Sequence, residues 1–189
     1  VLTRAGFEIE FVSPKGGLPP MDGIQGADAA SRSFLDSPDV KRKLESTFTP
    51  DAIHAEDYAA IFFVGGHGTM WDFPQDRLLV SMAAAIYESG GVVGAVCHGP
   101  AALVNLKLSD GGYLVSGKRV AAFTDEEEKA VGLDGIVPFL LASTLREKGA
   151  IHVAAANWQE NVVVDGRLVT GQNPASAEGV GREMARLLR

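Results

Sequence analysis

The sequence predicts an α/β fold, a three-layer α/β/α sandwich in which a doubly wound, mainly parallel sheet lies between helices. Two observations support this prediction. Short apolar segments of strand length alternate along the chain with segments whose apolar residues recur at helical spacing. The run 59–64 is apolar at every position and is followed by glycines, as in parallel strands that are buried on both faces.

Composition and charge narrow the class of protein. The chain has 189 residues, 46% of them hydrophobic and 22% charged, which suits a globular protein with one core. The net charge of −7, without a lysine or arginine cluster, argues against nucleic-acid and membrane-surface partners. Apolar runs are shorter than the ~20 residues that a membrane helix needs. Cys97 is the single cysteine, so an internal disulfide is excluded and a reducing, cytoplasmic compartment is predicted.

The first residues resemble the end of a helix. Residues 1–6 end at Gly6, a typical left-handed helix stop, and a strand is predicted at 7–13 before Pro14. In an alternating α/β chain, a helix end normally follows a strand. We therefore expect 1–189 to be a single domain that lacks its first strand and part of its first helix.

The segment 14–50 is long for a connection between two strands. Its first half is rich in glycine and proline, and its second half carries the charged stretch 36–45. Long connections of this kind are often functional, so a lid-like insertion that covers the active site is predicted. The alternative is a surface excursion with one short helix.

The remaining elements follow in the order that α/β units require. Strands are predicted at 59–64, 91–96, 119–123 and 151–155. Helices are predicted at 75–89, 138–148 and 175–189, and two more begin near Pro100 and Thr124. A hairpin joins 161–164 to 167–170 through Asp165-Gly166, a pair typical of a type I′ turn.

The segment around Cys97 predicts a nucleophile. A short apolar strand runs directly into a helix start at this residue, and Ala95 and Gly99 flank it with the small side chains that a tight elbow needs. A helix N-terminus favours thiolate over thiol. The backbone N–H of His98 is then placed to stabilise an oxyanion. The alternative is a buried, unreactive cysteine.

The loop Gly65-Gly66-His67-Gly68 follows the preceding strand, on the side of a parallel sheet where ligands bind. Its exposed N–H groups suit an oxyanion or substrate site at Gly65, Gly66 and His67. A phosphate loop is disfavoured because no Gly-Lys-Ser/Thr follows, and the remaining alternative is a tight turn without a binding role. The four histidines are too scattered for helical metal-ligand spacing, so no metal and no cofactor are predicted. The alternative is a metal held by His67 and a ligand upstream of this sequence.

An acidic cluster begins the helix after the 119–123 strand. Thr124 and Glu127 form a capping box, so Glu127 has a structural task, and Asp125, Glu126 and Glu127 are expected at a solvated helix start. Glu128 points elsewhere on the helix and is a candidate partner for a catalytic histidine.

Two motifs resemble the ThiJ/PfpI superfamily, whose members have a flavodoxin-like, class I glutamine amidotransferase-like fold. They are Gly65-Gly66-His67-Gly68-Thr69-Met70-Trp71-Asp72 and Ala95-Val96-Cys97-His98-Gly99-Pro100. The first is similar to the branch of heat-shock chaperones and glutathione-independent glyoxalases. The likeness extends over most of the chain, including 11–17 and 165–176.

The resemblance implies a nucleophile at Cys97, its histidine at His98 and the triad acid at Glu128, with oxyanion donors in the backbone of Gly66 and His98. A further family glutamate, which follows the first strand, has no position in this sequence. The implied activity is glutathione-independent conversion of methylglyoxal or glyoxal to a 2-hydroxy acid, D-lactate from methylglyoxal, in a homodimer.

Two alternative functions use the same thiol. The first is a cysteine peptidase or amidase, which a histidine adjacent to the nucleophile mildly disfavours, because such a residue usually points away at an elbow. The second is a stress chaperone or redox sensor whose thiol is oxidised.

Overall fold

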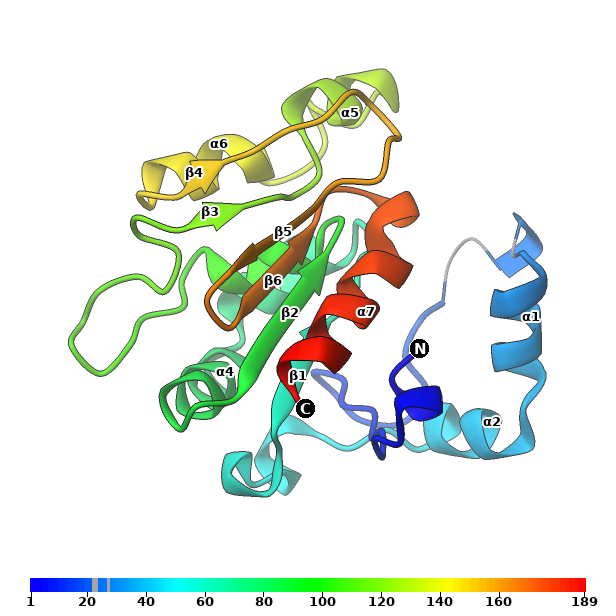
Figure 1. The fold of residues 1–189 in the computed structure, drawn as a ribbon. Coiled ribbons are helices and arrows are strands. Elements are labelled where there is room, and N and C mark those ends of the chain that lie inside the picture. Colours follow the sequence, from blue (N-terminus) through cyan, green and yellow to red (C-terminus); the bar gives the residue numbers. More distant parts are fainter. Residues whose placement is uncertain (22–23, 27) are drawn as a thin grey trace. The chain divides into compact units, whose positions relative to one another are not determined.

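A computed structural model describes residues 1–21, 24–26 and 28–189 of the chain. They fall into two compact units, one formed by Val1–Phe7 and His54–Arg189 and the other by Glu8–Ile53. Figure 1 labels the elements of both units.

A four-stranded sheet forms the centre of the larger unit. Its order is β1-β2-β6-β5, in which β1 pairs with β2 and β2 with β6 in parallel, while β5 runs antiparallel to β6. The bounds of these strands are Ala60–Phe63, Val92–Val96, Val162–Asp165 and Leu168–Gly171 for β1, β2, β5 and β6. A second sheet pairs β3 (Arg119–Val120) with β4 (Ile151–His152), also in parallel. The predicted mainly parallel sheet is therefore confirmed.

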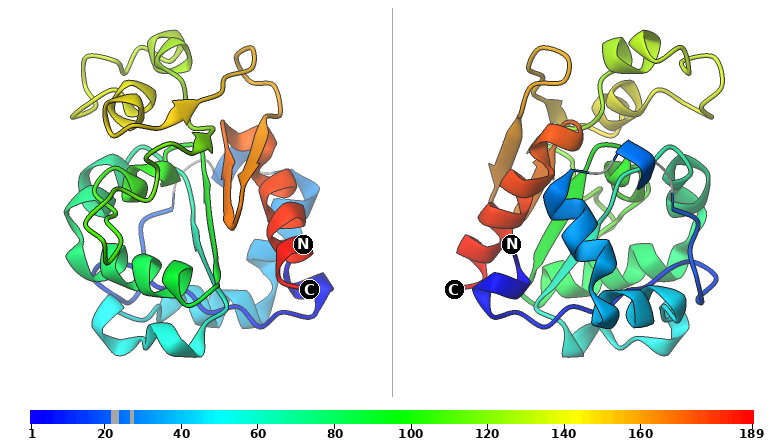
Figure 2. Two further views of the ribbon diagram at one scale, coloured as in Figure 1. Left: turned by 60° about the vertical axis from the view of Figure 1, so that its left-hand side comes forward. Right: turned by 90° about the vertical axis from the view of Figure 1, so that its right-hand side faces the viewer.

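Helices cover both faces of the four-stranded sheet, as the sandwich prediction requires. Figure 2 shows α4 (Arg77–Glu88) on one side of β2 and α7 (Ala177–Leu187) on the other. The α7 residues Val180 and Met184 pack into a buried cluster with Val92, Val96 and Val169 of the strands. These side chains are almost wholly withdrawn from water, so their burial fixes β2 and the residue that follows it.

Shorter helices lie at the ends of the strands. They are α3 (Thr69–Asp72), α5 (Asp125–Ala130) and α6 (Leu141–Glu147), and Figure 1 shows α5 and α6 near the two-stranded sheet. The predicted capping box of α5 is confirmed, because Thr124 and Glu127 exchange both side-chain-to-backbone bonds. Thr170 on β6 accepts a 2.9 Å bond from the backbone N–H of Ala121, which joins the segment before α5 to the central sheet.

The described part of the smaller unit has two α-helices, α1 (Ala29–Asp36) and α2 (Pro38–Glu45), where a single short helix was the alternative expectation. The predicted strand 7–13 is wrong. Among its residues, which are all described, Val12 forms one isolated bridge with Phe48, so this segment does not have the run of pairs that a strand needs. The predicted lid role of 14–50 stays a prediction, and residues 22, 23 and 27 of that range lie outside the described part.

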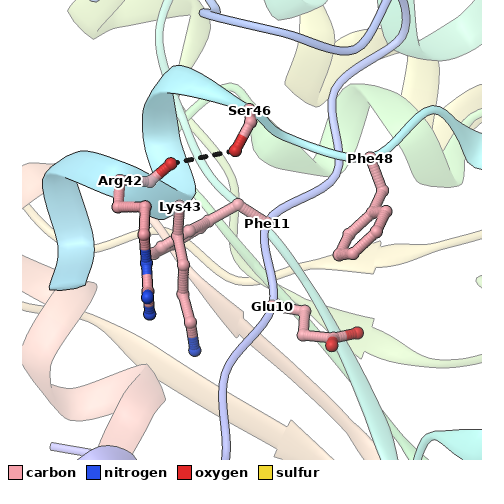
Figure 3. A pocket seen from close by; sticks show the side chains of 6 residues that line it. All are labelled: Glu10, Phe11, Arg42, Lys43, Ser46 and Phe48. Atoms are coloured by element: carbon pink, nitrogen blue, oxygen red, sulfur yellow. Dashed lines mark hydrogen bonds between the residues drawn. The ribbon is translucent and has the colours of Figure 1, made fainter.

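A cavity of about 210 Å³ opens within the smaller unit. Figure 3 shows its lining, formed by Glu10, Phe11, Arg42, Lys43, Ser46 and Phe48. The Ser46 hydroxyl donates a 3.0 Å bond to the carbonyl of Arg42, and the Lys43 ammonium donates a 2.8 Å bond to the carbonyl of Ile9. The first bond closes the last turn of α2, and the second holds α2 against the extended segment that precedes Pro14.

Three further predictions are refined. Gly6 has φ 94°, so the predicted left-handed stop is confirmed, although the turn before it is a 3₁₀ turn at Thr3–Ala5. The helix predicted from Pro100 is a 3₁₀ turn at Gly99–Leu103, and the helix predicted at 138–148 begins three residues later, at Leu141.

The hairpin loop is shifted by one residue from its predicted place. Asp165 pairs with Leu168, which leaves Gly166 and Arg167 in the loop, and only Gly166 of the two has a positive φ, 60°. The type I′ turn at Asp165-Gly166 is therefore wrong. Asp165 stays in the strand, where its carboxylate accepts a 2.9 Å bond from the backbone N–H of Arg119.

Candidate active site

Cys97 lies at a strained turn directly after β2. Its φ is 62°, a left-handed conformation that few non-glycine residues adopt. Two backbone bonds hold the turn: the Cys97 N–H donates to the Gly171 carbonyl over 2.9 Å, and the Phe123 N–H donates to the Cys97 carbonyl over 3.0 Å. The predicted tight turn is thus present, and its bonds to β6 and to the segment between β3 and α5 fix its shape.

Glycine is required at two positions that pack against this turn, one after Cys97 in the chain and one in the loop after β1. A Cβ atom at Gly99 would lie 2.2 Å from the Phe63 carbonyl oxygen, and one at Gly65 would lie 2.7 Å from the Cβ of Cys97. Neither contact can be relieved by rotating a flexible side chain. The glycine loop and the cysteine turn are therefore packed directly against each other.

A chain of polar contacts leads from the thiol into the protein. The Sγ of Cys97 lies 3.4 Å from the Nδ1 of His98, and the Nε2 of His98 lies 2.7 Å from the Oε2 of Glu128. His98 and Glu128 are buried. The expectation that His98 points away from the thiol is wrong, because the left-handed turn at Cys97 brings its ring back toward the sulfur. An ionised carboxylate only accepts, so Nε2 carries the hydrogen and the lone pair of Nδ1 faces the thiol.

His67 contacts the second oxygen of the same carboxylate. Its Nε2 lies 2.9 Å from the Oε1 of Glu128, and its ring centroid lies 4.1 Å from that of His98. The expected oxyanion or substrate role of His67 stays a prediction, and the structure adds this contact between its ring nitrogen and Glu128. The side chain of His67 is 36% exposed, whereas that of His98 is 1% exposed, so His67 forms the solvent side of this histidine pair.

The thiol and the imidazole are both held in their neutral forms. Burial raises the pKa of Cys97 to about 11, against the opposing effect of the backbone N–H groups of His98 and Gly66. Burial also lowers the pKa of His98, and its hydrogen bond to Glu128 opposes this shift. The expectation of a thiolate maintained by a helix N-terminus is therefore corrected: burial outweighs the effect of a short 3₁₀ turn. A neutral thiol facing a neutral base still allows proton transfer during attack.

Glu127, next to Glu128, caps the helix and also binds three residues from other parts of the chain. Its carboxylate is fully buried, and Oε1 accepts bonds from Trp158, Gln172 and Asn173. Burial raises the pKa of Glu127, but these bonds together with that from Thr124 outweigh it, so the pKa lies below its usual range. The expectation of a solvated side chain is wrong for Glu127.

Sequence reasoning did not single out the three residues that hold Glu127. Gln172 and Asn173 belong to the 165–176 segment that carried the family resemblance, so a signal for them existed. Asp125 also departs from the solvated expectation, because its Oδ2 accepts a 2.6 Å bond from Ser143, while Glu126 is exposed as expected.

One group of side chains in the described ranges has the geometry to hold a metal ion. The ligand atoms of His67, His98 and Glu128 lie within 4.8 Å of one another. Both imidazoles already share hydrogen bonds with the carboxylate, so an ion would have to replace two bonds that satisfy the group as it stands.

An α/β sandwich with a strained cysteine turn and an adjacent histidine–carboxylate pair defines a class of proteins, and the profile of the DJ-1/PfpI family matches residues 1–187. The chain belongs to this family. It is 38% identical over 186 residues to the glutathione-independent glyoxalase HSP31 of Saccharomyces cerevisiae, covering 92% of this chain and 78% of that protein. It is 32% identical over 190 residues to glyoxalase 3 of Candida albicans, covering 94% of this chain and 80% of that protein.

Solved structures of similar proteins agree with this family assignment. Rapid encystment protein 24 kDa of Francisella tularensis superposes with a TM-score of 0.93 at 37% identity, over 99% of this chain and 86% of that one. Glyoxalase III of Candida albicans superposes with a TM-score of 0.91 at 30% identity, over 100% of this chain and 83% of that one. Within the described residues, no helix combines the length and apolar character needed to cross a bilayer.

Proposed function

We propose that this protein is a glutathione-independent glyoxalase that converts methylglyoxal or glyoxal to the corresponding 2-hydroxy acid, through a hemithioacetal on Cys97. The observation that carries the proposal is the chain of contacts from Cys97 through His98 to Glu128. Relatives named as glutathione-independent glyoxalases, up to 38% identical to this chain, support the choice of reaction.

The first step forms a carbon–sulfur bond. The Nδ1 of His98 accepts the thiol proton while Sγ attacks the aldehyde carbon, and the carbonyl oxygen becomes an alkoxide. The backbone N–H groups of Gly66 and His98, which act on the sulfur, are the donors for this oxygen. The imidazolium then returns its proton to the alkoxide, which completes the hemithioacetal. Glu128 stabilises the imidazolium between these two transfers.

The second step moves a proton between the two substrate carbons. A base removes the hydrogen of the hemithioacetal carbon, and the neighbouring carbon takes up a proton in its place. The hemithioacetal hydroxyl gives its proton to the ketone oxygen, so the ketone becomes a hydroxyl and the hemithioacetal becomes a thioester. His98 is the base that this chain places beside the sulfur. Water then hydrolyses the thioester, which regenerates the thiol and releases D-lactate when the substrate is methylglyoxal.

The test is methylglyoxal consumption without glutathione and after metal chelation, with D-lactate and L-lactate assayed separately. We expect D-lactate from the wild type and none from Cys97→Ala. His98→Asn should also lose lactate formation, and His54→Asn is its matched control, because the His54 side chain is exposed and forms no cap bond. The absence of lactate, or lactate formation that survives Cys97→Ala, would overturn the proposal.

A cysteine peptidase or amidase is the second candidate, because His98 faces the thiol as the general base of a cysteine hydrolase does. Turnover of a fluorogenic peptide amide that is lost in Cys97→Ala, with no lactate from methylglyoxal, would favour it. The chaperone and redox-sensor readings, the homodimer and the cytoplasmic location stay predictions.

A further inference from the structure

Trp158 has a backbone conformation that its size makes costly. Its φ is 65°, and among the described residues it shares a positive φ outside glycine only with Cys97. A bulky residue keeps this conformation only where its surroundings impose it, and such positions cluster at functional sites. At Cys97, the left-handed backbone positions the thiol of the proposed nucleophile. The left-handed backbone at Trp158 needs a separate structural cause.

The cause is the buried carboxylate of Glu127. Its Oε1 accepts a 2.8 Å bond from the backbone N–H of Trp158. The same oxygen accepts a 2.8 Å bond from the Nδ2 of Asn173, which also donates over 2.9 Å to the carbonyl of Gln159. A capping box needs only the bonds between Glu127 and Thr124. The additional bonds tie the loop that carries Trp158 to the helix that carries Glu128.

The indole is placed at the open end of an aromatic row that begins at the catalytic histidine. The Phe123 ring lies 4.4 Å from the His98 ring, and the Trp158 ring lies 5.7 Å from the Phe123 ring, measured between centroids. Phe123 is 4% exposed and Trp158 is 46% exposed. The row therefore runs from the buried imidazole to an indole that is half exposed to solvent.

We infer that Trp158 determines substrate specificity, by forming the outer wall of the subsite for the substituent on the substrate's second carbonyl carbon. The inference rests on the proposed function. An indole face is a good surface for flat or apolar groups, because aromatic pairs gain from both buried area and ring geometry. The favoured class is α-oxoaldehydes with an aromatic or apolar substituent, represented by phenylglyoxal. Glyoxal, which carries hydrogen at that position, makes no use of the wall.

The experiment compares kcat/KM for glyoxal, methylglyoxal and phenylglyoxal. We expect Trp158→Ala to lower the phenylglyoxal-to-glyoxal ratio roughly tenfold, the loss expected when one aromatic contact is removed. Trp158→Phe keeps a ring and should retain most of the ratio. Ile151→Ala is the control, because this apolar side chain is also exposed, at 55%, but lies beside Arg119 at the start of β3, whereas the site follows the ends of the strands, so its ratio should not change.

A glycine variant separates specificity from strain. Trp158→Gly removes the indole and relieves the left-handed backbone, whereas Trp158→Ala removes the indole and keeps the strain. Equal loss of the ratio in both variants supports the inference. A ratio that is unchanged in Trp158→Ala, or is lost in alanine and restored in glycine, would overturn it. A wild type that turns over none of the three aldehydes would overturn the proposed function, and this inference with it.

Discussion

Replacing Glu128 with glutamine tests how this carboxylate sets the tautomer of His98, the proposed base. The carboxylate accepts from both imidazoles, with 2.7 Å to His98 and 2.9 Å to His67. A glutamine amide has one accepting oxygen and one donating nitrogen, so one imidazole must give up its Nε2 hydrogen and carry it on Nδ1. If that imidazole is His98, its Nδ1 can no longer accept the thiol proton.

The exposure of the two rings decides which one changes. His98 is sealed from water, and its Nδ1 faces the thiol, whereas His67 is one-third exposed and can change tautomer more freely. We therefore expect the amide nitrogen to turn toward His67 and His98 to keep its basic form. What is lost is the charge-assisted part of one hydrogen bond, about 1–1.5 kcal/mol, or roughly a tenfold fall in kcat/KM.

The assay is lactate formation from methylglyoxal by the wild type, Glu128→Gln and Glu128→Ala, with thermal unfolding to check the fold. The alanine variant leaves both imidazoles without a partner and should lose more activity than the glutamine variant. Inverting the tautomer of a catalytic histidine costs about 10⁴ in kcat in a serine protease. A loss of that size in Glu128→Gln would contradict this expectation, because it would mean that His98, not His67, faces the amide nitrogen.

Three further predictions follow from burial and packing. Since burial lowers the pKa of His98, the acidic limb of kcat/KM against pH should have its midpoint below the ordinary histidine value of 6.5, and a midpoint above it would contradict the assignment of His98 as base. Gly99→Ala should destabilise the protein by about 1–3 kcal/mol in urea unfolding, because the new Cβ meets the Phe63 carbonyl; Gly68→Ala, where nothing lies within 4 Å, is the control and should have little effect. Glu127→Ala should cost about 3 kcal/mol, because it leaves buried donors unpaired. The pKa of Glu127 is lower in the folded protein than in the unfolded chain, so its carboxylate stabilises the fold fully above the pKa of the unfolded state. This stabilisation is lost as pH falls through the pKa of the folded state. If acidification lowers the stability of the wild type no more than that of Glu127→Ala, this prediction is contradicted.

The parts of the fold that could be predicted depend on local signals. The strands β1 and β2, the helix α4 and the cysteine turn each carry their signal within about ten residues, as apolar runs, helical spacing or small flanking residues. The strand predicted at 7–13 has such a local pattern but forms only one bridge, because a strand also needs a partner that no local pattern supplies.

The residues of the site could be predicted from the sequence, but most of the contacts between them could not. Cys97, His98 and Glu128 could be proposed from motif and resemblance, and they do lie together. The bond from His67 to Glu128 spans 61 positions, and no spacing rule reaches that far. The raised pKa of Cys97 also could not be read from a helix start, because it depends on how much protein surrounds the sulfur.

The adjacency of Glu127 and Glu128 on α5 has a consequence for how this protein can change. Successive residues of a helix point about 100° apart, so one carboxylate reaches the Trp158 loop while the next reaches the histidine pair. Inserting or deleting one residue between Thr124 and Glu128 would rotate both away from their partners at once. This turn of helix therefore tolerates no change in length. A one-residue insertion or deletion would reduce the stability of the protein and its reactivity together.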